Sequence, residues 1–151
     1  MHIKLNSKNK TEIINQFLQP ISRISEECSL SVSSDSISTL INDNSGAIIL
    51  YAKLKTKTGL QETENTTLNF KDIRKLIKIF DCIGDENFVL KVNDDASVIS
   101  HKSASISFKL HLVLDNVIKK CTVSIDKISK LTFDSYFELT RDKINEILRG
   151  S

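Results

Sequence analysis

The chain has 151 residues, of which 40% are hydrophobic and 26% charged, with 21 basic and 19 acidic side chains. This length suits one domain, or one domain plus part of another, and the composition excludes collagen-like, low-complexity and wholly disordered chains. No apolar run reaches the roughly 18 residues that a membrane-spanning helix needs, so we expect no membrane partner.

The cysteines and the N-terminus indicate a cellular compartment. Residues 1–10 are polar and lack the apolar segment of a secretory signal. Cys28, Cys82 and Cys121 cannot all pair within one chain, and none belongs to a CxxC motif. We therefore predict a cytoplasmic protein whose cysteines are reduced and act as small hydrophobic residues.

The first half of the chain contains one predicted helix among strands. Apolar residues at 13, 14, 17, 18 and 21 form one helical stripe, with Ser7 or Asn9 as the expected N-cap. Pro20 lacks a backbone donor and is expected to end or kink this helix. Alternating apolar residues, with turns near 33–35 and 42–46, predict strands at 2–6, 28–32, 37–41 and 47–57.

After a polar stretch at 58–66, the same order of elements returns. A short strand at 67–70 precedes a helix at 71–81 whose apolar face holds Ile73, Leu76, Ile77 and Phe80. Alternation then predicts three further strands, at 88–92, 96–102 and 105–114.

A third pass begins near the end of the sequence, with a strand at 133–139 and a helix from Thr140. An apolar-x-x-apolar-apolar signature recurs at 14/17/18, 73/76/77 and 144/147/148. The sequence therefore predicts an α+β domain over residues 1–116. It would consist of two β-α-β-β-β repeats, at about 1–57 and 66–115, whose two helices pack on one face of an antiparallel sheet. Residues 117–132 would form a linker, and residues 133–151 the start of a second, truncated domain.

The second predicted helix is the most informative segment for function. Lys71, Lys75 and Lys78 lie opposite its apolar stripe, with Arg74 on the flank, against only two acidic residues. A solvated helix face is one interpretation of this pattern. A row of cations spaced to meet phosphates is the other.

The other two helices carry fewer candidate DNA contacts. The first presents Lys8 and Arg23 opposite its apolar stripe, and the third presents Arg149 with Lys143 at its flank. No aromatic residue interleaves with these charges, so base stacking is not expected. Contacts to nucleic acid would be to the backbone and insensitive to base sequence.

The repeated order of elements resembles that of the DNA sliding clamps, most closely those of tailed bacteriophages. Three segments carry the resemblance. Residues 68–77 resemble the strand that leads into the family's second helix, and residues 42–45 resemble an Asp-containing turn of cellular clamps. Phe137-Glu138-Leu139-Thr140, followed by residues 144–148, resembles the entry to a second clamp domain.

The resemblance implies a DNA polymerase processivity factor, or an N-terminal fragment of one, that encircles duplex DNA. The helices would face the phosphates of the DNA, and the protomers would form a homo-oligomer, which is a trimeric ring in the full-length family. The protein would act in the cytoplasm, or in the host cytoplasm if it is viral. Partners would be a DNA polymerase and a clamp loader. They would dock near Asn42 and Ala47 and on the linker at Ile128 and Leu131.

No enzyme site or cofactor is expected. No HxxxH, HxxE or CxxC motif groups metal ligands, and His111 falls on the polar side of its strand. Four glycines supply no phosphate-binding loop of the GxxxxGK type. Two Ser-x-x-Lys matches, at 7–10 and 124–127, are expected by chance in a chain rich in both residues.

Two alternatives to a clamp remain. The first is an interaction module of the same fold, which self-associates through exposed edge strands and does not act on DNA. The second is a small enzyme with an unrecognised site, which would need a pocket that joins His101 to acidic residues.

Overall fold

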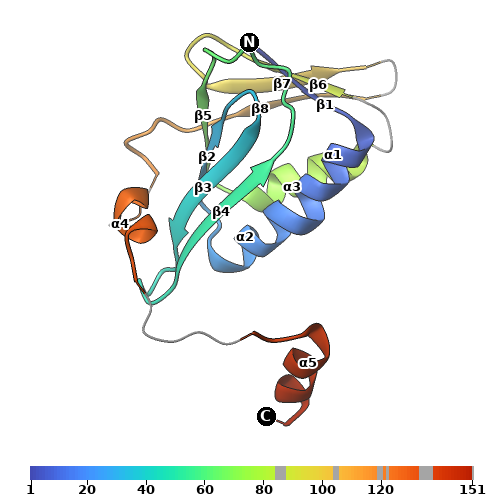
Figure 1. The fold of residues 1–151 in the computed structure, drawn as a ribbon. Helices are drawn as coiled ribbons and strands as arrows, with labels where there is room; N and C mark the ends of the chain where they lie inside the picture. Colours follow the sequence, from blue (N-terminus) through green and yellow to red (C-terminus); the bar gives the residue numbers. More distant parts are fainter. Residues whose placement is uncertain (84–87, 104–105, 119–120, 122, 133–137, 151) are drawn as a thin grey trace.

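A computed structural model describes residues 1–83, 88–103, 106–118, 121, 123–132 and 138–150. In this part of the chain, strands form two sheets, and the helices of the first 83 residues lie together on one side of them (Figure 1). The strands are β1 (His2–Leu5), β2 (Cys28–Val32), β3 (Ser36–Asn42), β4 (Ile49–Lys55), β5 (Thr66–Phe70), β6 (Phe88–Val92), β7 (Val98–Lys102) and β8 (Ser107–His111). The helical segments are α1 (Ser7–Glu12), η1 (Ile13–Leu18), α2 (Gln19–Ile24), α3 (Ile73–Cys82), α4 (Ile125–Ser129) and α5 (Arg141–Gly150).

The predicted α+β class, with antiparallel strands and two helices on one side, is confirmed, but the strands form two four-stranded sheets rather than one. Their orders are β4-β3-β2-β5 and β1-β6-β7-β8. Each sheet therefore takes three strands from one half of the chain and the first strand of the other half. Pairing between distant strands is not encoded in local periodicity, so the sequence could not predict this exchange.

In each half of the chain, the segment after the last strand pairs with the first strand. This pairing covers the edge of one sheet at β1 and the edge of the other sheet at β5. The amide of Lys4 in β1 donates to the carbonyl of Thr58 at 2.7 Å, and the amide of Val113 donates to the carbonyl of Asn69 in β5 at 3.1 Å. Strands β4 and β8 remain as the outer edges. The strands predicted at 47–57 and 105–114 therefore form these two edges.

The first helix continues through Pro20, so the expectation that this residue ends or kinks the helix needs correction. The middle of the helix, η1, is π-helical, and the amide of Gln19 donates to the carbonyl of Ile14, five residues earlier. Pro20 then lies in the first turn of α2, where a backbone donor is not needed. The helix therefore runs from Ser7 to Ile24.

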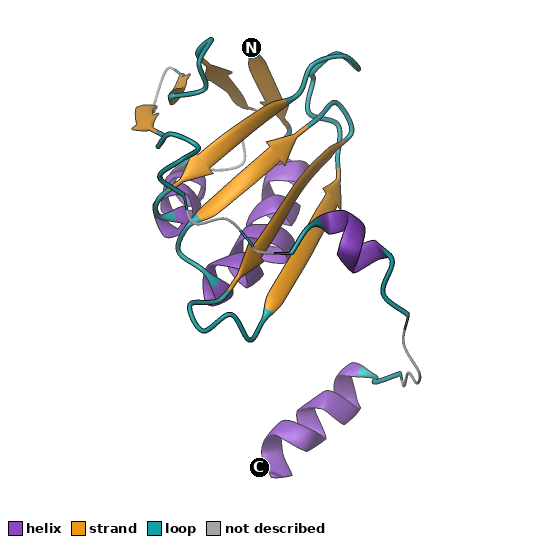
Figure 2. Ribbon diagram, turned by 90° about the vertical axis from the view of Figure 1, so that its left-hand side faces the viewer, coloured by secondary structure: helices purple, strands orange, loops and turns teal. Residues whose placement is uncertain are grey.

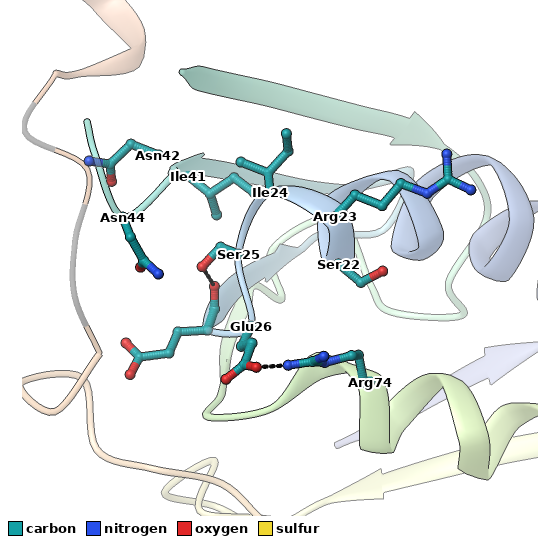
Figure 3. A pocket seen from close by; sticks show the side chains of 10 residues that line it. Ser22, Arg23, Ile24, Ser25, Glu26, Ile41, Asn42, Asn44 and Arg74 are labelled. Atoms are coloured by element: carbon teal, nitrogen blue, oxygen red, sulfur yellow. Dashed lines mark hydrogen bonds and ion pairs between the residues drawn. The ribbon is translucent and has the colours of Figure 1, made fainter. Parts of the chain in front are cut away.

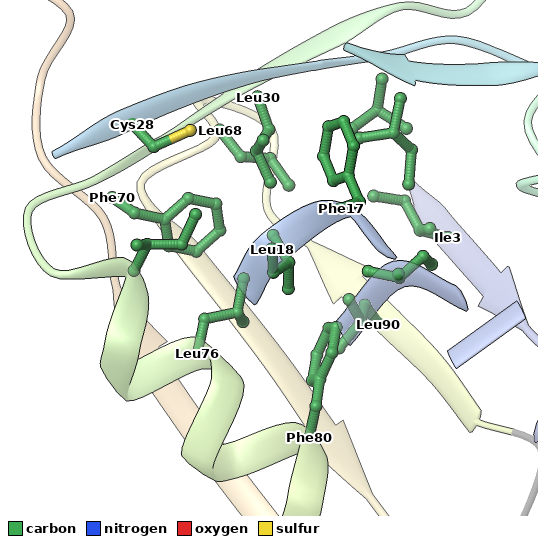
Figure 4. Close-up of a cluster of buried hydrophobic side chains, with 14 of the residues drawn as sticks. Ile3, Phe17, Leu18, Cys28, Leu30, Leu68, Phe70, Leu76, Phe80 and Leu90 are labelled. Carbon is green, nitrogen blue, oxygen red and sulfur yellow. The ribbon is translucent and has the colours of Figure 1, made fainter. Parts of the chain in front are cut away.

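The core lies between the helices and the two sheets (Figure 4). Phe17 and Leu18 of η1 meet Leu76 and Phe80 of α3 over strand residues such as Leu30. A buried apolar side chain of this size contributes roughly 1.5–3 kcal/mol relative to its exposed state. This shared core fixes both helices side by side, with their polar sides directed away from the sheets.

Two segments differ from the sequence expectations. Helix α4 lies inside the predicted linker, where Ser124 caps it by accepting a hydrogen bond from the amide of Lys127. The Ser-x-x-Lys match at 124–127 is therefore a helix start. The strand predicted at 133–139 falls mainly outside the described residues. No described helix is long and apolar enough to cross a membrane.

Candidate nucleic-acid interface

Helix α3 positions the main candidate DNA contacts. The carboxylate of Asp72 caps it by accepting a hydrogen bond from the amide of Arg74 at 3.0 Å. Its apolar residues, Ile73, Leu76, Ile77 and Phe80, are all buried. The opposite side of the helix is therefore held toward solvent.

The four predicted cations of this segment differ in their surroundings. Lys75 and Lys78 are exposed, and neither makes an ion pair within the described residues. Lys71 is paired with Glu27, and Arg74 is paired with Glu26. Both pairs escape prediction from the sequence because the glutamates lie more than 40 residues earlier in the chain, where no helical spacing relates them to the cations.

Arg74 also borders a hollow of about 470 Å³ at the end of α2 (Figure 3). Its guanidinium approaches Glu26, and its Nε lies 3.7 Å from Oδ1 of Asp72. The hydroxyl of Ser25 donates to the carbonyl of Glu27 at 2.8 Å and so fixes the turn that carries both glutamates. Roughly half of the Arg74 side chain stays exposed, at 52%. This ion pair is therefore of the solvent-screened kind that contributes little to stability.

The first helix adds two exposed cations, Lys8 in α1 and Arg23 in α2. Together, residues 7–24 and 71–82 hold seven cations and three anions, while the whole chain carries a net charge of +2. The helical layer is therefore positively charged, and the rest of the chain is slightly negative. Such an uneven distribution is the electrostatic feature expected of a surface that meets phosphates.

Helix α5 carries the two remaining predicted cations, Lys143 and Arg149. Both are exposed, and no residue of α5 is buried. Figure 1 shows α5 away from the sheets and from the other helices. The structure therefore unites six of the eight predicted DNA contacts on one layer and leaves these two apart.

The predicted partner-docking residues lie at two places. Asn42 ends β3 and lines the hollow beside Arg74, and Ala47 lies exposed in the turn between β3 and β4. Ile128 is half-buried in α4, and Leu131 follows it, 59% exposed. Figure 2 shows α4 in front of the outer face of sheet β4-β3-β2-β5, with the helical layer behind the sheet.

A second hollow, of about 530 Å³, lies between this outer sheet face and the linker. Leu40 of β3 lines it from the sheet, and Ile118 and Ile125 line it from the linker. The linker residues predicted from the sequence were instead Ile128 and Leu131, because the sequence carries no signal for which side of the linker turns toward the sheet.

The two histidines considered for an enzyme site have different surroundings. His101 is buried, and its Nδ1 donates to the carbonyl of Val89 at 3.2 Å. His111 is exposed, as predicted. Within the described residues, no group of three or more His, Cys, Asp or Glu side chains is arranged to hold a metal ion.

The fold is that of the DNA sliding clamps. The chain matches a structure titled "C-terminal region of FEN-1 bound to A. fulgidus PCNA" with a TM-score of 0.64 and 15% identity, over 82% of this chain and 49% of that chain. It also matches the beta clamp of Helicobacter pylori bound to a DNA ligase peptide (TM-score 0.60, 19% identity, 82% of this chain and 34% of that chain). A third match is the DNA polymerase III subunit beta from Pseudomonas aeruginosa (TM-score 0.61, 14% identity, 82% of this chain and 33% of that chain).

The chain thus spans about half the length of the first of these clamp chains and about a third of the others. No protein-family model and no curated protein matches the sequence. At these sequence identities the matches show the fold alone. The function is therefore inferred from the charges and shape of the surface.

Proposed function

We propose that this protein is a sliding clamp, or part of one, that surrounds duplex DNA without sequence specificity and tethers a DNA polymerase. The observation that carries the proposal is the layer of two helices, whose exposed side is basic, in a chain with the clamp fold. The helical side would face the DNA, and the sheets would form the outside of the ring.

The contacts suit sliding. Lys75 and Lys78 are flexible, exposed point charges that meet phosphates of any sequence. Lys71 and Arg74 can exchange their glutamate partners for phosphates, because exposed ion pairs contribute only about 0–1 kcal/mol. Weak backbone contacts of this kind hold a ring near DNA without fixing its position.

We further propose the domain division expected from the sequence: a clamp domain at 1–116 built from two repeats, a linker at 117–132, and the start of a second clamp domain at 133–151. The exchanged first strands support the repeat, because each half then contributes equivalent strands to equivalent places. The clamp chains that match are longer than the matched region, which supports further clamp domains in the working assembly.

The assembly would be a homo-oligomeric ring, trimeric by analogy with the family, loaded by a clamp loader. Edge strands β4 and β8 have unpaired backbone groups and are the natural places for protomers to join. Partner peptides would dock near Asn42, Ala47 and the linker. Two of the matched structures support this, since one clamp is bound to a region of FEN-1 and another to a DNA ligase peptide.

We also propose that the protein is a scaffold rather than an enzyme and acts in the cytoplasm, that of a host cell if it comes from a bacteriophage. The clamp fold supports the scaffold assignment, and the sequence resemblance supports the phage assignment.

The decisive experiment measures binding to long duplex DNA by fluorescence anisotropy at several salt concentrations. The Lys75→Glu/Lys78→Glu variant should lose about tenfold or more in affinity and reduce the salt slope by about 2, since two phosphate contacts are removed. The control is Lys127→Glu/Lys130→Glu, which makes the same charge change on exposed residues of the linker. Equal losses in both variants would show that only net charge matters and would contradict the proposal.

An interaction module of the same fold is the second candidate, favoured by the two open sheet edges. It predicts self-association in sedimentation experiments together with salt-insensitive, negligible binding to duplex DNA. Binding that depends on Lys75 and Lys78 would exclude it.

A further inference from the structure

The outer face of sheet β1-β6-β7-β8 is basic, although it lies on the side of the sheet away from the helices. Strand alternation directs to this face the side chains that do not join the core. None of them is acidic. The outward residues are His2 and Lys4 of β1, Val89 and Lys91 of β6, Val98, Ser100 and Lys102 of β7, and Ser107, Lys109 and His111 of β8.

The strand register gathers these cations into one area. His2 lies opposite Lys91, Lys91 lies opposite Ser100, and Ser100 lies opposite Lys109. Adjacent strands are about 4.8 Å apart, so Lys91 and Lys109 lie about 10 Å from each other across the sheet. Lys102 lies opposite Ser107, two residues further along each strand, and widens the same area.

Within the described residues, the lysines of this face have no acidic partner. Lys4, Lys91, Lys102 and Lys109 make no ion pair within the part of the chain that the structure describes. Lys71 and Arg74 on the helical side, by contrast, are both paired. The positive potential of the outer face is therefore not neutralised within the described structure, and it favours an anionic partner.

The same face contains a shallow hollow with an apolar floor. Backbone pairing between β6 and β7 ends at Lys91 and Ser100, and beyond it the ring of His101 hydrogen-bonds to the carbonyl of Val89. The strands separate there and leave a hollow of about 610 Å³. Val89, 39% exposed, lines it together with lysines on either side, and Phe108, whose side chain packs toward the core, borders it.

We propose that this face binds an acidic peptide segment of a partner protein, with one apolar side chain of the peptide over Val89. The carboxylates on either side of that residue would meet Lys91, Lys102 and Lys109. About five extended residues span four strands, which matches the width of the sheet. The surface lies on the opposite sheet from the linker and does not depend on DNA binding by the helices.

A peptide fits this face better than nucleic acid does. A phosphate backbone would leave Val89 without an apolar partner, and among the side chains described on these strands no exposed Phe, Tyr or Trp ring offers a platform for bases. A peptide that alternates acidic and apolar residues offers carboxylates to the lysines and an apolar side chain to the floor of the hollow.

The test measures anisotropy of a fluorescent peptide in which Asp and Glu flank a central Phe. A peptide with Asn and Gln in place of the acidic residues is its control. The Lys91→Glu/Lys109→Glu variant should weaken binding of the acidic peptide about tenfold or more, because two attractive charges become repulsive. Lys53→Glu/Lys55→Glu on β4 and Lys75→Glu/Lys78→Glu on α3 should leave binding within about twofold.

A second variant and a second readout test the hollow itself. Val89→Ser should reduce the affinity several-fold while Val89→Leu retains it, because the floor contributes through apolar contact. In the unaltered protein, amide resonances of β6, β7 and β8 should shift on titration with the peptide. Equal losses in all charge variants, no shifts on this sheet, or displacement of the peptide by equimolar single-stranded or duplex DNA would each overturn the proposal. Loss of DNA binding on Lys75→Glu/Lys78→Glu would not affect it.

Discussion

Three aspartates in turns accept hydrogen bonds from residues close to them in the sequence. Asp35, Asp43 and Asp95 each have a pKa below the ordinary value of 3.8, with side-chain hydroxyls as the largest cause. For Asp43, the hydroxyl of Ser45 donates at 2.6 Å and the amide of Ile48 donates at 3.0 Å. These contacts fix the turn between β3 and β4, where a partner peptide is proposed to dock.

This lowered pKa predicts a pH-dependent contribution of Asp43 to stability. The carboxylate stabilises the folded state above 3.8, and this stabilisation is lost as the pH falls through the lower folded-state pKa. Asp43→Asn should therefore lower the urea midpoint at neutral pH, and the difference from the unaltered chain should shrink below pH 3.8. Asp94→Asn, at an exposed turn position, is the control. A difference that stays constant with pH would contradict this account of the turn.

The cysteines should differ in how readily a thiol reagent modifies them, because they differ in burial. Burial raises the pKa of the Cys28 thiol to about 11, partly offset by the hydrogen bond with Thr39, whereas Cys82 is exposed. Because the thiolate is the reactive form, Ellman's reagent should modify Cys82 in the folded protein and Cys28 only after unfolding. A Cys82→Ser/Cys121→Ser variant isolates Cys28 and should stay unmodified until denaturant is added. Rapid labelling of that folded variant would show that Cys28 is accessible.

At the scale of helices and strands, local pattern predicts element type well and pairing poorly. The apolar stripe of α3 follows from the sequence, and the structure confirms it, although the helix begins at Ile73 rather than at the predicted residue 71. The passage of the first helix through Pro20 could not be predicted, because it depends on the π-helical hydrogen bonds of η1. The ion pairs of Lys71 and Arg74 also escaped prediction, since their glutamates come from another part of the chain.

The packing of α3 predicts a large effect from a single side chain. Leu76 is 2% exposed in the shared core, so Leu76→Ala should lower the free energy of unfolding by about 2–5 kcal/mol through lost apolar contact and an unfilled cavity. Ile147→Ala on α5, where the side chain is 59% exposed, should change it by less than about 0.5 kcal/mol. Urea unfolding followed by circular dichroism measures both. Similar losses would mean that α5 is packed against the domain in solution.

At the scale of the whole molecule, the exchange of first strands makes the two halves depend on each other. Sheet β1-β6-β7-β8 is incomplete without β1, and sheet β4-β3-β2-β5 is incomplete without β5. Helices from both halves also share one core. The described part of residues 1–118 should therefore unfold as one cooperative unit.

This dependence is tested by dividing the chain in the exposed loop between Glu62 and Thr63. Each fragment alone should lack a stable fold, because one sheet loses a strand and the core loses a helix. An equimolar mixture should regain the circular dichroism spectrum of the intact chain. A fragment that folds by itself as a monomer would show that the halves are independent.

The exchanged strands also bear on ancestry. If the two halves descend from one shorter gene, a protein made from a single copy could complete its sheets only by lending β1 to a second copy and receiving the equivalent strand in return. Such an ancestor would have been an obligate dimer with two-fold symmetry, and fusion of the genes would have preserved its architecture while freeing each half to diverge. The basic outer face of one sheet and the linker-covered face of the other would then be the products of that divergence.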